Sequence, residues 1–113
     1  MLAKKYRLTR QNDFDKVFKN GRSFFNKEVG VKYANNDLDY SRFGFVVSNK
    51  ISKKATERNK IKRRLREVIR LDFPKIKKGV DTVVVARTGI GELGYKEIEE
   101  RVITCLKRLR LLN

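Results

Sequence analysis

One stretch of the chain decides its fold and most of its chemistry: S-N-K-I-S-K-K-A-T-E-R-N-K-I-K-R-R-L-R-E-V-I-R, from Ser48 to Arg70. From Asn49 onward it holds ten Lys or Arg and two acids, a net charge of +8 in 22 residues and half of the chain's +16. Its apolar residues recur at the spacing of one helix face, at Ile61, Leu65, Val68 and Ile69. The stretch therefore predicts an amphipathic helix that packs on a core, not a disordered run of charge.

The opposite face of this predicted helix is rich in guanidinium groups. At about 100° per residue, five side chains fall within an arc of roughly 100°: Asn59, Lys62, Arg63, Arg66 and Arg70. Such a stripe is consistent with entry into a DNA major groove, or with a position along an RNA backbone where Arg contacts phosphates. Composition alone does not choose between these two targets.

The charge of the whole chain is typical of a polyanion-binding protein. It has 29 Lys or Arg against 13 Asp or Glu, and an isoelectric point near 10.3. We expect nucleic acid and not a membrane as the partner, because no segment approaches the roughly 20 apolar residues of a membrane span. The N-terminal residues have no apolar run of signal-peptide type. With Cys105 as the only cysteine, we expect no intrachain disulfide and a reducing, cytoplasmic location.

The chain contains no histidine. Histidine is the commonest general base and the commonest zinc ligand, and histidine-dependent catalytic triads require it. Its absence therefore weighs against an enzyme that works on its own.

The remaining patterns predict one domain over residues 1–113, with elements in the order α-β-β-β-α-β-α. Thr9 is the expected N-cap of a first helix that ends at Gly21 and carries Phe14 and Phe18 on one face. This pattern is consistent with two core rings, or with two rings that stack on single-stranded bases.

Three strand candidates follow, at residues 22–27, 29–33 and 42–48, and we expect them to form an antiparallel meander. The basic helix is expected to follow, with Ser52 as its cap. The β-branched run 81–87 predicts a strand buried on both faces. A last helix, at about 95–111, would bury Cys105 as a small hydrophobic residue. The fold class is therefore α+β, with helices on a small sheet.

Three segments resemble motifs of the bacterial ribonuclease P protein family. The run E-R-N-K-I-K-R-R-L-R-E resembles its R-N-x-x-K-R-x-x-R signature, and every defining position is filled here, by Arg58, Asn59, Lys62, Arg63 and Arg66. V-S-N-K-I-S-K-K-A is similar to the family's strand-end motif and F-D-K-V-F-K-N-G to its first-helix motif. Together they cover nearly the whole chain in the right order. Asn49 departs from the family, which usually has a basic residue there.

The resemblance implies a fold like that of the ribosomal protein S5 domain, with a left-handed β-α-β crossover through the basic helix. It implies that the chain is the protein component of ribonuclease P, an endonuclease that hydrolyses precursor tRNA to release the 5′ leader. The partners would be the catalytic RNA and precursor tRNA, and not DNA or a membrane. Mg²⁺ held mainly by RNA would activate the water, and no catalytic group would come from the protein. The alternative is a ribosomal or other structural RNA-binding protein.

The resemblance also implies a role for individual residues. The five signature residues, Arg58, Asn59, Lys62, Arg63 and Arg66, would face the catalytic RNA. Five others would contact the precursor-tRNA leader: Phe14, Phe18 and Tyr33 as an aromatic cleft, and Ser48 and Lys50 at the strand end near the cleavage site.

Overall fold

The computed structural model describes residues 3–112. Within this range the helices and strands follow the predicted order: α1 (Gln11–Asn20), β1 (Arg22–Phe25), β2 (Val29–Asn35), β3 (Arg42–Val46), α2 (Ala55–Asp72), β4 (Val80–Ala86) and α3 (Tyr95–Arg108). Short 3₁₀ turns lie at Lys4–Tyr6, Phe73–Lys75 and Ile90–Glu92. The described residues therefore form one α+β unit of three helices and four strands, which confirms the predicted fold class.

The four strands form one mixed sheet in the order β1-β2-β4-β3. β1 pairs antiparallel with β2, as expected, but the predicted meander is wrong for β3. β4 lies between β2 and β3, antiparallel to the first and parallel to the second. The physical reason is that β4, a β-branched run, is the strand best suited to pairing on both edges. Two parallel neighbours need a long crossover connection, and α2 lies within it.

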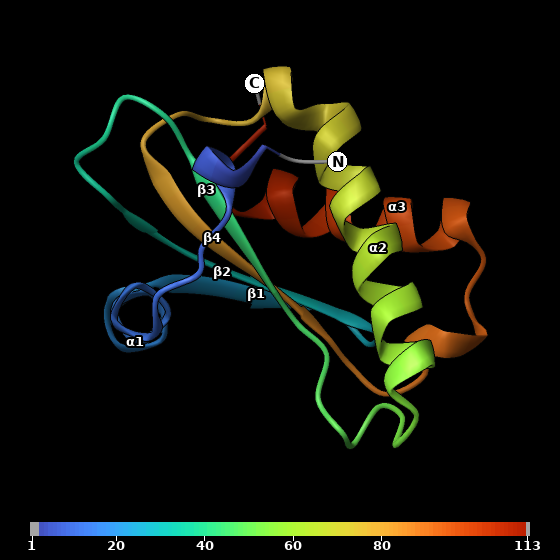
Figure 1. The fold of residues 1–113 in the computed structure, drawn as a ribbon. Coiled ribbons are helices and arrows are strands. Elements are labelled where there is room, and N and C mark those ends of the chain that lie inside the picture. The colour runs from blue at the N-terminus through green and yellow to red at the C-terminus, as the bar shows by residue number, and fades with distance from the viewer. Residues whose placement is uncertain (1–2, 113) are drawn as a thin grey trace.

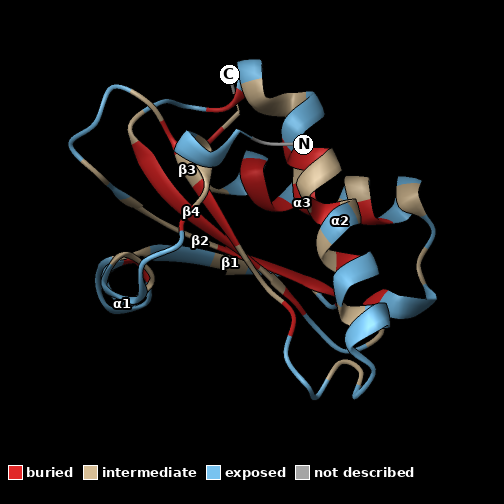
Figure 2. Cartoon of the chain, in the orientation of Figure 1, coloured by how far each residue is buried: buried red, intermediate tan, exposed pale blue. Residues whose placement is uncertain are grey.

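Helices cover the sheet unequally on its two faces. α2 and α3 pack on one face, and α1 packs on the other (Figure 1). Alternate side chains of β4 pack on opposite faces of the sheet. Val84 belongs to the large hydrophobic cluster under α2 and α3, whereas Val83 packs with Leu8 and Val17 on the α1 side. β4 is accordingly buried along its length, as predicted (Figure 2).

The apolar face of α2 is the one that the sequence predicts. Ile61, Leu65, Val68 and Ile69 are all buried in the large cluster. Burial of side chains of this size stabilises a fold by about 1.5–3 kcal/mol each. The predicted caps are wrong, because α1 and α2 begin one or more residues later than expected. Their N-cap positions are Arg10 and Lys54, so neither Thr9 nor Ser52 is a cap.

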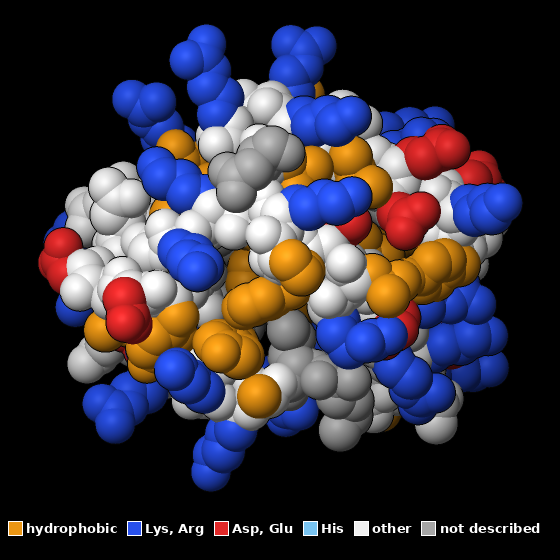
Figure 3. Space-filling view, turned by 90° about the horizontal axis from the view of Figure 1, so that it is seen from above, with side chains coloured by type: hydrophobic (Ala, Val, Ile, Leu, Met, Phe, Trp, Pro, Cys, Tyr) orange, Lys and Arg blue, Asp and Glu red, His pale blue; other side chains and the backbone are white. Residues whose placement is uncertain are grey.

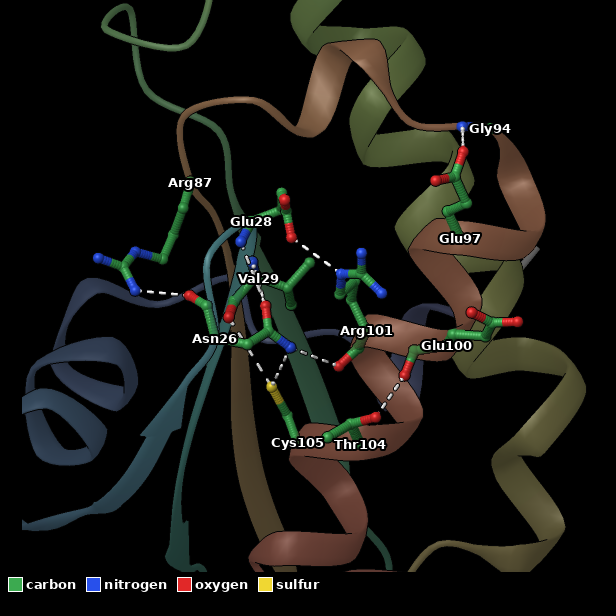
Figure 4. Close-up of polar contacts among 10 residues, drawn as sticks. All are labelled: Asn26, Glu28, Val29, Arg87, Gly94, Glu97, Glu100, Arg101, Thr104 and Cys105. Carbon is green, nitrogen blue, oxygen red and sulfur yellow. Dashed lines mark hydrogen bonds and ion pairs between the residues drawn. The ribbon is translucent and has the colours of Figure 1, made fainter.

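The turn between β1 and β2 is tied to α3 by polar contacts (Figure 4). The Asn26 side chain accepts hydrogen bonds from the backbone N–H groups of Glu28 and Val29, at 3.2 and 2.9 Å, and donates one to the carbonyl of Arg101, at 3.0 Å. The Arg101 guanidinium donates to the Glu28 carboxylate at 2.8 Å. Cys105 lies beside Asn26, fully buried, which confirms it as a small core residue.

An ion-pair cluster holds α1 against the sheet. Arg42 of β3 donates two hydrogen bonds to the carboxylate of Asp81 in β4, at 2.9 and 2.6 Å. Its guanidinium also lies 3.4 Å from the carboxylate of Asp13 in α1. The hydrogen bond to Asp81 is the main cause of the raised pKa of Arg42. The cluster therefore fixes the helix that carries Phe14 and Phe18.

Candidate nucleic-acid interface

The outer face of α2 presents four of the five signature residues. Asn59 and Arg63 are exposed, and Lys62 and Arg66 are half-buried. The Arg66 guanidinium lies over the ring of Phe45 in β3, 6.0 Å from its centroid. This contact places Arg66 near the edge strand of the sheet and restricts its side chain. A restricted guanidinium loses less conformational entropy when it binds a phosphate.

Two other arginines of α2 are engaged within the protein. Arg70, at the end of the predicted stripe, donates two hydrogen bonds to Glu67, at 3.0 and 2.5 Å. This pairing lowers the pKa of the Glu67 carboxyl. Arg64 lies on another side of the helix and donates to the carbonyl of Leu93 at 3.4 Å. The free positive charge of the stripe is thus concentrated at Lys62, Arg63 and Arg66.

Arg58, the fifth signature residue, serves a different surface. It is half-buried, and its guanidinium donates to the carbonyl of Ser52 at 2.9 Å. Together with Asn49, Lys50 and Lys53 it lines a hollow between the end of β3 and the start of α2. The structure thereby brings Arg58 next to Lys50, which the sequence assigned to a separate group. Three cations and one amide at this hollow are groups suited to binding a phosphate.

The two phenylalanines of α1 differ in their surroundings. Phe14 is half-buried and packs with Leu8 and Val17; a Cβ added at Gly44 would lie only 2.5 Å from its ring. Phe18 is 42% exposed, and its ring has the Lys32 ammonium 5.3 Å from its centroid. Of the two, Phe18 therefore offers the ring that is open to a base.

Tyr33 does not join these rings. The side chains of β2 alternate: Val29, Val31 and Tyr33 pack with the cluster under α2 and α3, whereas Ala34 packs with the cluster on the α1 side. The structure therefore does not bring Tyr33 together with Phe14 and Phe18, because successive residues of a strand point to opposite faces. Tyr33 instead lines a hollow with Lys16 and Asn20 of α1, and its contact with the leader stays a prediction. Lys32, its neighbour, lies beside Phe18 and also donates to the Phe18 carbonyl at 3.3 Å.

Sequence patterns missed two further residues on the α1 side. Phe25, at the end of β1, is 42% exposed, and the Arg87 guanidinium lies 5.3 Å from its ring centroid. Its ring lies over Gly30 of β2, where a Cβ would collide with it. We refer to Phe18, Phe25, Lys32 and Arg87 as the α1-side platform. The signal that could have found it is the strand register, which pairs Phe25 with Gly30.

The strand-end residues lie where β3 leads into α2. Ser48 and Lys50 are both exposed, in the loop that joins these two elements (Figure 1). The loop follows β3, which pairs parallel with β4, and the chain continues from the loop into α2. The loop thus connects the α2 surface with the sheet.

The described residues contain neither a metal-binding cluster of side chains nor a membrane-spanning helix. Among residues 3–112, no group of three or more His, Cys, Asp or Glu side chains could hold a metal ion. No helix in the same range is long and apolar enough to cross a membrane.

Comparison with known proteins identifies the family. The family model described as Ribonuclease P matches residues 2–110. The chain belongs to the ribonuclease P protein family. The chain is 38% identical over 107 residues to the ribonuclease P protein component of Alkaliphilus oremlandii, covering 95% of this chain and 93% of that protein. It is 39% identical over 106 residues to the component of Streptococcus pneumoniae, covering 94% and 85%.

Solved structures of ribonuclease P proteins have the same fold. The Staphylococcus aureus protein aligns with a TM-score of 0.88 at 32% identity, over 96% of this chain and 98% of that one. The Thermotoga maritima protein aligns with a TM-score of 0.82 at 40% identity, over 90% and 96%. These matches favour the ribonuclease P family over the alternative of a ribosomal or other structural RNA-binding protein.

Proposed function

We propose that this chain is the protein component of ribonuclease P and binds the catalytic RNA of that enzyme through α2. Membership of the family, combined with an outward-facing signature on α2, carries the proposal. Lys62, Arg63 and Arg66 would contact phosphates, and Asn59 would add a hydrogen bond. Neutralised phosphates reduce the repulsion between catalytic RNA and substrate.

The precursor-tRNA leader is proposed to lie on the other surface. Phe18 offers a ring on which one single-stranded base can stack, and Phe25 offers a second, with a cation near each ring. Phe14 would act mainly by supporting α1, because its ring packs against Gly44. Ser48 and Lys50 would receive the leader near the cleavage site. Tyr33 packs with the cluster under α2 and α3, and its contact with the leader stays a prediction.

The chemical step is proposed to belong to the RNA. Mg²⁺ bound mainly by RNA would supply the activated water for hydrolysis of the phosphodiester, and the protein would contribute affinity. The protein would thus raise the affinity of the assembly for leader-bearing substrate without donating a catalytic group. Its place of action would be the cytoplasm, where precursor tRNA of bacteria is processed.

Leader release tests this proposal directly. The protein is mixed with a bacterial ribonuclease P RNA and a 5′-labelled precursor tRNA at low Mg²⁺, where the RNA alone is slow. We expect the protein to accelerate release of the intact leader. No acceleration over RNA alone would overturn the proposal.

Two controls sharpen this experiment. The protein without RNA should release no leader, since cleavage by the protein alone would indicate an independent nuclease. An Arg63→Ala, Arg66→Ala double variant should lose the acceleration at moderate salt and regain part of it at higher protein concentration. Lys96→Ala serves as the matched control, because Lys96 is an exposed cation of α3, away from the signature.

A further inference from the structure

A small aromatic pocket lies at the end of the sheet where β3 begins. Its walls include the rings of Tyr6, Tyr40, Phe43 and Phe73, and we call it the aromatic pocket. Its volume is about 280 Å³. This is slightly below the roughly 300–1,000 Å³ of pockets that hold drug-sized ligands, so it suits a single ring system.

The rings of the aromatic pocket support one another. Tyr6 lies 4.8 Å from Phe73 and 5.9 Å from Tyr40, between ring centroids, and Phe43 lies 5.8 Å from Phe73. Phe43 is buried in the core, whereas the other three rings are only half-buried. The walls are therefore anchored at the base and accessible at the mouth. Preformed aromatic walls favour binding because few side chains must be ordered.

Lysines surround the mouth. The Lys5 ammonium lies 4.4 Å from the centroid of the Tyr40 ring and 5.5 Å from that of Tyr6, and Lys78 also lines the pocket. Asp39 is the one acid among the lining residues described. Figure 3, which views this end of the molecule, shows hydrophobic side chains gathered among Lys and Arg side chains. The pocket thus combines aromatic faces with a net positive rim.

The aromatic pocket is separate from both surfaces described above. None of its lining residues belongs to the α2 signature or to the α1-side platform. The pocket opens beside Ser41, just before β3 begins. The strand-end site at Ser48 lies beyond the other end of the same strand. Seven residues of extended chain span about 23 Å. One RNA nucleotide cannot reach from one site to the other.

We propose that the aromatic pocket binds one unpaired nucleobase of an RNA, with Lys5 and Lys78 at the neighbouring phosphates. Base–aromatic stacking tolerates any base, since every base has a π face. It is also stronger than the exposed cation–π contact that Lys5 makes with Tyr40, so an entering base displaces the ammonium from the ring. The released ammonium then lies beside the phosphates. An acidic peptide fits the rim charge but leaves the aromatic faces unused, so the charge and the rings together favour RNA.

Tyrosine signals in NMR spectra of the full chain test this site. The chain has four tyrosines, and two of them, Tyr33 and Tyr95, lie outside the aromatic pocket as internal references. The probe is a single-stranded RNA of five adenylates, compared with an otherwise identical strand whose sugars carry no base. We expect the adenylate strand to shift the ring signals of Tyr6 and Tyr40, and the abasic strand to shift them far less.

Variants of Tyr40 give the affinity test. Tyr40→Ala should weaken binding of the adenylate strand by between about fivefold and 150-fold, the effect of losing one stacked base. Tyr40→Phe keeps the ring and should bind like the unaltered protein. Both comparisons are made in a Phe18→Ala, Phe25→Ala background, so that stacking on the two rings of the α1-side platform does not mask the result.

Each outcome decides the inference. Equal shifts with both strands, or with inorganic phosphate alone, would mean an anion site only and would overturn it. Unchanged affinity in Tyr40→Ala, with native thermal stability, would also overturn it. An acidic peptide that shifts Tyr6 and Tyr40 where the adenylate strand does not would assign the pocket to a protein partner instead. Because these measurements use no catalytic RNA, they stand whether or not leader release is observed.

Discussion

Phe18 carries the largest part of the proposed contact with a substrate base. The residue is 42% exposed, and the Lys32 ammonium lies 5.3 Å from its ring centroid. An aromatic face beside a cation can accept a base and its phosphate together. Phe14, one helical turn earlier, is held against Gly44 and so mainly fixes the position of α1.

Cys105 gives a prediction about reactivity. Burial raises the pKa of its thiol, so the nucleophilic thiolate is disfavoured in the native state. We expect a disulfide reagent such as DTNB to react slowly with the native protein at pH 8 and rapidly in denaturing urea. Rapid reaction of the native protein would mean that α3 does not hold this thiol in the core.

The same raised pKa has a consequence for stability. Above about pH 8.5 the unfolded thiol loses its proton while the native thiol keeps it, so unfolding becomes more favourable as pH rises. Urea unfolding of the unaltered protein and of Cys105→Ala should therefore show a stability difference that shrinks between pH 7 and pH 10. A difference that stays constant over this range would contradict the assignment.

Residue-level patterns predicted the core better than the ligand surface. The spacing of Ile61, Leu65, Val68 and Ile69 identified the buried face of α2, because burial follows helix periodicity. The sequence did not show that Tyr33 packs with the cluster under α2 and α3, because the face that a strand residue occupies depends on the register of the sheet. Phe25 was missed because its exposure depends on the pairing of β1 with β2, which no local pattern reveals.

At the scale of elements, the Arg42 cluster connects α1 to the centre of the sheet. Arg42→Met leaves the buried carboxylate of Asp81 without its cationic partner and with only the hydrogen bond that Asn36 donates at 2.9 Å. We therefore expect a loss of about 3 kcal/mol in the free energy of unfolding, the low end for broken buried pairs. Urea unfolding measures this loss. Asp13→Asn, which removes only the longer 3.4 Å contact, should cost clearly less. Equal losses in both variants would mean that Asp81 is not the main partner.

The basic stripe of α2 predicts a dependence on salt. Arg63→Ala and Arg66→Ala should each lower the slope of log affinity for catalytic RNA against log salt by about one unit, one for each lost phosphate contact. Arg70→Ala should change it less, because Glu67 already pairs with Arg70. Filter binding at several salt concentrations gives the slopes. Equal slopes for all three variants would contradict the claim that Arg63 and Arg66 contact RNA phosphates whereas Arg70 is occupied by Glu67.

The order of the elements was predictable from the chain, but the order of the strands was not. Turn residues and alternation locate each strand, whereas the position of β4 between β2 and β3 depends on long-range pairing. The crossover through α2 makes β3 and β4 parallel neighbours, and this sets α2 beside the edge strand. Only the assembled sheet therefore reveals that Arg66 lies over Phe45 and that Arg58 lies beside Lys50.

At the scale of the whole molecule, the net charge of +16 opposes folding through self-repulsion. Added salt screens these charges, with a Debye length of about 10 Å at 0.1 M. We expect Tm to rise with ionic strength, and to rise more in sulfate than in chloride. The Arg63→Gln, Arg66→Gln double variant should show a smaller rise, as followed by circular dichroism. A Tm that falls with added sulfate would contradict this account.

The central claim is that α2 holds the catalytic RNA while the α1-side platform holds the leader, and one comparison tests it. Affinities of the assembled enzyme are measured for leader-bearing precursor and for mature tRNA, alongside the affinity of the protein for catalytic RNA. Phe18→Ala should weaken only precursor binding, by roughly 1–3 kcal/mol, whereas Arg66→Ala should weaken only assembly with the RNA. If Phe18→Ala instead weakens precursor and mature tRNA binding equally at unchanged Tm, the leader does not lie on the α1-side platform.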